Sequence, residues 1–96
     1  MTGTARSSDG LDHRRKRLLF RCWHRGTREM DLILGRFADA HIAILDDADL
    51  ADLERLLEVP DADLFALYSS DGELPPEFGG RLFARIKTFD VAEPDL

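Results

Sequence analysis

Apolar residues recur at helical spacing along most of the chain, in segments that glycine, proline and aspartate separate. The clearest segment follows Thr27, where apolar side chains occupy positions i, i+3, i+4, i+7 and i+8: Met30, Ile33, Leu34, Phe37 and Ala38. Side chains at this spacing share one face of an α-helix. The pattern therefore predicts an amphipathic helix whose first turn the Thr27 hydroxyl caps.

The same period predicts a helix on each side of this one. The preceding helix ends near Arg25 and carries Leu11, Leu18, Leu19, Cys22 and Trp23. The following helix is capped by Asp46 and Asp47, is stopped by Pro60, and has the apolar positions Leu50, Leu53, Leu56 and Leu57. Between them, residues 41–45 are apolar and fit a brief extended link.

Two shorter helices are predicted in the last third of the chain. Asp61 is the expected cap of a fourth helix with Leu64, Phe65, Leu67 and Tyr68, which Asp71-Gly72 ends. Pro75 and Pro76 suit the first turn of a fifth helix, whose apolar stripe is Phe78, Leu82, Phe83, Ile86 and Phe89. Gly79 and Gly80 weaken the start of that helix by roughly 1 kcal/mol each.

Five short helices with short connections predict an all-α fold, a compact five-helix bundle of a single domain. The folded unit is expected over residues 11–89, with flexible tails at 1–10 and 90–96, where apolar periodicity is missing. At 96 residues the core must be small and efficiently packed.

Composition is typical of a water-soluble helical domain, with 44% hydrophobic and 33% charged residues. No apolar run approaches the roughly 20 residues that span a bilayer, so no membrane insertion is expected. The single cysteine, Cys22, rules out an intramolecular disulfide and favours a reducing compartment. We expect a monomer located in a bacterial cytoplasm.

Charge is distributed unevenly along the chain. Residues 1–36 hold nine Lys and Arg against four acids, whereas residues 37–96 hold four against fifteen. The basic residues, with Phe20 and Trp23 among them, leave open an alternative in which the first helix binds nucleic acid or another acidic partner. An acidic body with a pI near 4.9 argues against phosphate polymers. Trp23 is more simply read as a core aromatic.

A search for catalytic or metal-binding patterns finds none. The glycines form no phosphate-binding loop, and Cys22 and His24, two residues apart on a helix, point to different sides. Ser69 and Ser70 have no histidine near them in sequence that could activate a nucleophile. A bundle of this size also has little room for a substrate pocket of several hundred Å³. We therefore expect a protein that is not an enzyme.

The segment Arg25-Gly26-Thr27-Arg28-Glu29 joins the first two predicted helices. Glycine tolerates positive φ, so Gly26 can turn the chain while Thr27 caps the second helix. Charged side chains at such a corner are expected to be held outward, which makes the corner a candidate docking surface. A structural alternative is an exposed ion pair between Arg25 and Glu29, worth 0 to about 1 kcal/mol.

The residues 22–31, Cys-Trp-His-Arg-Gly-Thr-Arg-Glu-Met-Asp, resemble the signature region of the small succinate dehydrogenase assembly factors, called SdhE in bacteria, with its Arg-Gly-x-x-Glu motif. Residues 56–65 and 82–88 resemble two further segments of that family, in the same order. The chain departs from the family at Ala66-Leu67, where an aromatic residue often stands.

The resemblance implies a five-helix protein that binds the flavoprotein subunit of succinate dehydrogenase and promotes covalent attachment of FAD to a histidine of that subunit. Fumarate reductase flavoproteins are further candidate clients. The chemistry would occur in the client, and this chain would bind no FAD stably. The motif implies that Arg25, Gly26 and Glu29 contact the partner, with Arg28 and Asp31 beside them.

Overall fold

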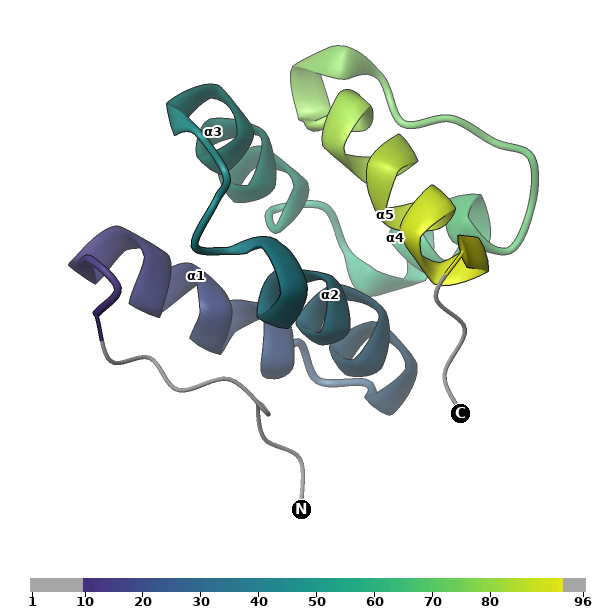
Figure 1. The fold of residues 1–96 in the computed structure, drawn as a ribbon. Coiled ribbons are helices and arrows are strands. Elements are labelled where there is room, and N and C mark those ends of the chain that lie inside the picture. Colours follow the sequence, from purple (N-terminus) through teal and green to yellow (C-terminus); the bar gives the residue numbers. More distant parts are fainter. Residues whose placement is uncertain (1–9, 93–96) are drawn as a thin grey trace.

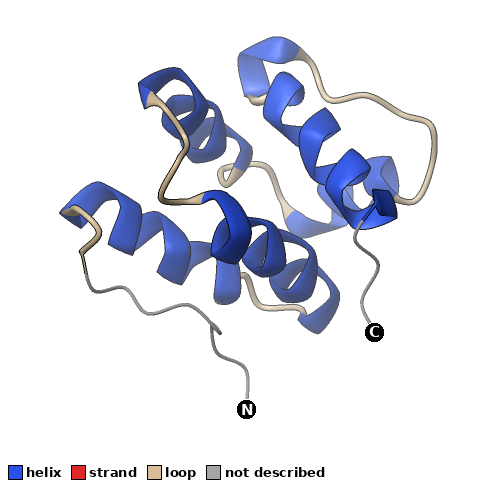
Figure 2. Ribbon diagram, in the orientation of Figure 1, coloured by secondary structure: helices blue, strands red, loops and turns tan. Residues whose placement is uncertain are grey.

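The computed structural model describes residues 10–92, and all the regular secondary structure within them is helical (Figures 1 and 2). The elements are α1 (His13–Trp23), α2 (Arg28–His41), α3 (Asp47–Leu56), α4 (Asp61–Tyr68), the 3₁₀ helix η1 (Pro76–Phe78) and α5 (Gly80–Ala92). This confirms the predicted all-α fold of five helices in one compact domain. None of the described helices has the length and apolar character needed to cross a membrane.

The helices pack as two neighbouring groups around one core. α1 and α2 lie against each other, α3 and α5 form the second contact, and α2 joins the two groups by packing on α5 (Figure 1). The core is made mainly of the stripes predicted from the sequence, and its largest fully buried side chains include Leu18, Leu34, Phe37, Leu53, Leu56, Leu82 and Phe83.

Side-chain caps start the first three helices. The hydroxyl of Thr27 accepts a hydrogen bond from the Met30 amide at 3.4 Å, and Asp46 accepts one from the Asp49 amide at 2.8 Å, which confirms both predicted caps. Asp12 caps α1 through the Arg15 amide. Each cap satisfies an amide that has no partner within its helix.

The predicted cap of α4 is wrong. Pro60 occupies the N-cap position without a side-chain bond, and Asp61 is the first helical residue. The carboxylate of Asp61 instead accepts hydrogen bonds from the side chains of Arg25 and Thr27. The local pattern predicted that the Asp61 carboxylate would cap α4, but it binds two residues that are distant in the sequence.

The predicted start of the fifth helix is also wrong, because the chain breaks at Gly79. That residue has φ of +84°, and a β-carbon placed on it would lie 2.3 Å from the Asp52 carbonyl oxygen. The break separates η1 from α5 and leaves Phe78 48% exposed, while Leu74 is buried. Phe78 therefore does not belong to the apolar stripe of α5.

The link between α2 and α3 is a turn rather than an extended segment. α2 continues to His41, whose carbonyl accepts hydrogen bonds from the amides of Ile44 and Leu45. The turn buries Ile42 and Leu45 and leaves Ile44 exposed. Of the two predicted tails, residues 1–9 and 93–96 lie outside the described residues, and α5 extends to Ala92.

Candidate functional site

The corner between α1 and α2, residues 24–29, turns at a glycine in the left-handed region. Gly26 has φ of +118°, as its predicted role requires, and a β-carbon built there would have no atom within 4 Å. α1 ends at Trp23, with His24 as its C-cap, close to the predicted end near Arg25. Gly26 is therefore an exposed backbone turn with open space above it.

Arg25 points into the protein, contrary to the expectation that the charged side chains of the corner face outward. Its side chain is only 11% exposed. Nε donates to Oδ1 of Asp61 at 2.6 Å, and the two terminal nitrogens donate to the carbonyl oxygens of Leu57 and Val59. The side chain thus fastens the corner to the turn between α3 and α4.

Asp31, in the first turn of α2, also holds the corner through an internal contact. Its Oδ1 accepts a hydrogen bond from the backbone amide of Arg25 at 2.6 Å, and its side chain is half-buried. The amide of Arg25 follows the end of α1 and has no helical partner, so the carboxylate supplies one.

The exposed residues of the corner are His24, Gly26, Thr27, Arg28 and Glu29. Within the part of the chain that the structure describes, the side chains of Arg28 and Glu29 have no ion-pair or hydrogen-bond partner. The alternative ion pair between Arg25 and Glu29 is not formed, because Arg25 pairs with Asp61. The corner therefore presents one cation and one anion beside a residue without a side chain.

Sequence reasoning missed Asp61 and the hydroxyl of Thr27 as parts of this site. Oδ2 of Asp61 accepts from Thr27 Oγ1 at 3.3 Å, while Oδ1 accepts from Arg25. The available signal was the second family-like segment, residues 56–65, which contains Asp61 and both carbonyls bound by Arg25. In the structure, hydrogen bonds join this segment to the signature-like segment, residues 22–31, in one site.

Most arginines of α1 serve internal contacts. Arg14 makes two bonds to the Glu54 carboxylate, at 2.9 and 2.7 Å, and this lowers the pKa of Glu54 below its ordinary value of 4.5. Arg15 binds Asp12 and the carbonyls of Ile42 and Leu45, and Arg21 pairs with Glu58. Ion pairs with acids occupy three of the four arginines of α1, which leaves less free positive charge for nucleic acid and disfavours that alternative.

Trp23 and Cys22 belong to the core. Trp23 is 7% exposed and its indole nitrogen donates to Asp39 at 3.1 Å, which confirms that it is a core aromatic. Burial raises the pKa of the Cys22 thiol to about 12, so the thiol stays protonated and is a poor nucleophile. Over the described residues, no three His, Cys, Asp or Glu side chains gather as a metal site.

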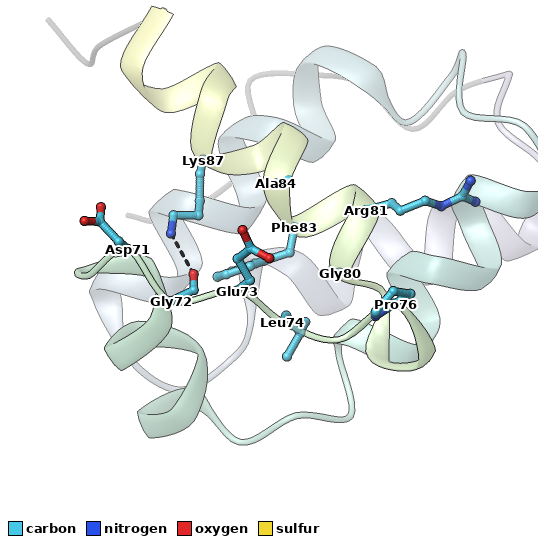
Figure 3. Close-up of a pocket in the computed structure, with 10 residues that line it drawn as sticks. All are labelled: Asp71, Gly72, Glu73, Leu74, Pro76, Gly80, Arg81, Phe83, Ala84 and Lys87. Atoms are coloured by element: carbon cyan, nitrogen blue, oxygen red, sulfur yellow. Dashed lines mark hydrogen bonds between the residues drawn. The ribbon is translucent and has the colours of Figure 1, made fainter.

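A cavity of about 490 Å³ lies between the segment after α4 and the first half of α5 (Figure 3). The expectation that so small a bundle has little room for a pocket of several hundred Å³ is therefore wrong. The reason is that residues 69–75 swing wide of α5 in an irregular path (Figure 1). Lys87 holds that path, because its ammonium donates to the carbonyls of Leu67, Ser70 and Gly72 at 2.9 to 3.1 Å.

The charges around this cavity do not suit a phosphate-bearing ligand. Lys87 already uses its three donors, and Arg81 extends away from Lys87 toward Asp52, with an N–O distance of 3.6 Å (Figure 3). Asp71 and Glu73 are exposed and have no ion-pair partner among the described residues. The uncommitted charge is negative, so the pyrophosphate of a dinucleotide would be repelled.

Comparison with known proteins gives one consistent result. The model of a family described as "Flavinator of succinate dehydrogenase" matches residues 16–90. The chain is 43% identical over 58 residues to the FAD assembly factor SdhE of Acetobacter pasteurianus, covering 60% of this chain and 53% of that protein. It is 40% identical over 68 residues to the mitochondrial succinate dehydrogenase assembly factor 2 of Dictyostelium discoideum, covering 71% and 48%.

A similar relative from Danio rerio, also a mitochondrial succinate dehydrogenase assembly factor 2, is 30% identical over 86 residues, which cover 88% of this chain and 54% of that protein. The chain thus spans about half the length of the curated relatives it matches. No solved structure gives a significant match.

Proposed function

Because the chain belongs to the family of succinate dehydrogenase flavinators, we propose that it binds the flavoprotein subunit of succinate dehydrogenase and promotes covalent attachment of FAD to that subunit. The observation that carries the proposal is the family match over residues 16–90, which includes the whole corner and the turn to which it is fastened. Fumarate reductase flavoproteins are proposed as further clients.

The partner-binding site is the corner. Gly26, Arg28 and Glu29 are among the exposed residues of the corner, and the absence of a side chain at Gly26 allows the backbone of a partner to approach closely. Arg28 and Glu29 supply opposite charges whose donors and acceptors are free for a partner. Arg25 and Asp31 belong to the same site and lie beneath this surface.

We place the flavinylation chemistry in the client, with this chain acting as an assembly factor and not as an enzyme. Attack of a client histidine on the flavin requires the two reactants to be held in register, since small misplacements cost orders of magnitude in rate. A factor promotes that step when it binds the competent arrangement of the immature client more tightly than the others. The mature client then releases it.

FAD is proposed to be held by the client alone. The cavity beside α5 is large enough for part of a dinucleotide, but its free side-chain charges are those of Asp71 and Glu73. The factor would therefore carry no cofactor of its own, bind no nucleic acid, and act as a monomer in a bacterial cytoplasm without inserting into the membrane.

The test mixes the protein with the apo flavoprotein subunit and FAD and follows acid-stable flavin fluorescence against a reaction without the factor. Wild type should accelerate labelling. Glu29→Lys should lose most of this effect while remaining folded, since an exposed side chain contributes at most about 0.5 kcal/mol to stability. Glu77→Lys, which reverses an exposed acid on η1, is the matched control and should behave as wild type. Labelling that wild type does not accelerate would overturn the proposal.

A further inference from the structure

We infer that Arg25 and Asp61 are positioning residues that set the shape of the corner, rather than groups that the partner contacts. Asp61 has no role in the site described above other than its bonds to Arg25 and Thr27. The inference rests on the proposed function, since it assigns how the same site is held. We call the bonds from Arg25 and Thr27 to residues 57–61 the corner link.

The corner link uses every nitrogen of the Arg25 guanidinium. Nε binds Asp61, one terminal nitrogen binds the Leu57 carbonyl, and the other binds the Val59 carbonyl. These acceptors lie 32 to 36 residues further along the chain. A planar guanidinium held at three places and 11% exposed has little capacity left for a partner.

Asp61 holds both neighbours of Gly26. Its Oδ1 accepts from Arg25 on one side of the glycine and its Oδ2 accepts from Thr27 on the other. Gly26 itself is unobstructed and, as a glycine, has the widest choice of backbone conformations. The two bonds to one carboxylate therefore restrict the backbone on both sides of Gly26.

The same carboxylate is connected to the start of α2. The hydroxyl of Thr27 donates a hydrogen bond to Asp61 and accepts one from the amide of Met30. Asp61 therefore holds the side chain that caps α2. Arg28 and Glu29 lie between those two points, in the first turn of the helix. Their directions relative to Gly26 consequently depend on a residue of α4.

Loss of the corner link should lower the fraction of molecules whose corner is ready to bind. The apparent affinity falls by that fraction, while the rate at saturating factor is unchanged, because the bound complex presents the same contacts. Glu29 differs in this respect, since a contact residue can change both quantities. The dependence of the rate on factor concentration therefore separates a positioning residue from a contact.

The experiment compares Asp61→Asn, Arg25→Lys and the double variant with wild type, at a temperature where all are folded. Asparagine keeps the size of the side chain but removes the charge that receives Arg25. Lysine keeps the charge of Arg25, but its compact ammonium lacks the planar fork with which the guanidinium spans its three acceptors. Arg15→Lys is the matched control, because Arg15 also binds two carbonyls and one carboxylate, at the other end of α1.

Two readouts are taken. The first is the chemical shift of the Gly26 amide in the NMR spectrum of the free protein. Asp61→Asn and Arg25→Lys should each change this shift, whereas Arg15→Lys should not. The second is the factor concentration that gives half-maximal flavinylation. It should rise roughly tenfold in each single variant, as expected for one charge-assisted hydrogen bond, with an unchanged maximal rate. The double variant should add little, because both changes break one link.

An unmoved Gly26 resonance in Asp61→Asn would overturn the inference, and this result needs no client. If wild type fails to stimulate flavinylation, the proposed function falls while the resonance still tests the link. A lower maximal rate at an unchanged half-maximal concentration would make Arg25 and Asp61 contacts and also overturn the inference. Should Asp61→Asn not fold, Thr27→Val takes its place, with Thr27→Ser as the conservative variant that should retain both readouts.

Discussion

The indole ring of Trp23 lies flat against the backbone of Gly35, so that a β-carbon built on this glycine would come 2.3 Å from Cδ2 of the ring. Gly35 is in the middle of α2, where glycine is otherwise unfavourable. Its missing side chain lets the tryptophan at the end of α1 pack directly on the second helix. This contact lies one residue from the α1–α2 corner and fixes how the two helices meet.

Gly35→Ala should therefore destabilise the protein, by about 1 to 3 kcal/mol, because the ring must move out of a filled space. The sign of this change in the free energy of unfolding is informative, since replacing glycine by alanine in an unobstructed helix normally stabilises a protein by up to about 1 kcal/mol. Urea unfolding followed by far-UV circular dichroism measures the change. A variant as stable as wild type would mean that the Trp23 ring has room to shift.

Cys22 should resist alkylation in the native protein. Its thiol is fully buried, and desolvation raises its pKa to about 12, so the reactive thiolate is scarce at pH 8. Labelling by iodoacetamide should then require unfolding and follow the unfolded fraction as urea is added. Rapid labelling without denaturant would show that the C-terminal turn of α1 opens on its own.

The bond between Arg14 and Glu54 should make stability depend on pH in the acid range. Because the hydrogen bond from Arg14 holds the pKa of Glu54 below 4.5 in the folded state, the pair stabilises the protein above that pH. The contribution is lost as the pH falls through the lower folded value. Glu54→Gln should therefore show a flatter fall in melting temperature between pH 5 and 3 than wild type. Parallel curves would contradict this.

Gly26→Ala should cost stability even though no atom obstructs the new methyl group. The cost arises from φ of +118°, which L-residues rarely adopt, and should be about 1 to 3 kcal/mol. Gly10→Ala, at φ of +86° with equally open surroundings, is the matched control for strain away from the corner. Client binding measured well below the melting temperature tests the docking role separately. Undiminished binding by folded Gly26→Ala would restrict this glycine to a backbone role.

The sequence pattern predicts the elements well and their mutual contacts poorly. The stripe from Met30 to Ala38 and the caps at Thr27 and Asp46 depend on residues within a few positions of one another, and all are confirmed. Asp61 and Arg25 are 36 residues apart, so no local pattern could show that each would choose the other over a cap or an outward position. The sequence indicates that Gly79 weakens a helix, but the break at this residue depends on the carbonyl of Asp52, which the fold brings close.

The cavity beside α5 was missed for a related reason. Its size depends on the path of residues 69–75, which Lys87 fixes through three carbonyls 15 to 20 residues before it in the chain. A lysine in a helical pattern is normally expected to face solvent. Nothing in the spacing of Lys87 shows that it binds a carbonyl in the last turn of α4. Irregular segments held by a single side chain are hard to predict from periodicity.

Arg15 and Arg25 bind backbone carbonyls near the two ends of α1, and this has a consequence for how the fold responds to acid. A guanidinium keeps its proton at any pH a protein meets, and a peptide carbonyl does not titrate. These attachments therefore persist where carboxylate pairs such as that between Arg14 and Glu54 are neutralised. Acid should therefore break the contact between Arg14 and Glu54 while the bonds to backbone carbonyls at both ends of α1 remain, so that the helix separates from its neighbours in stages.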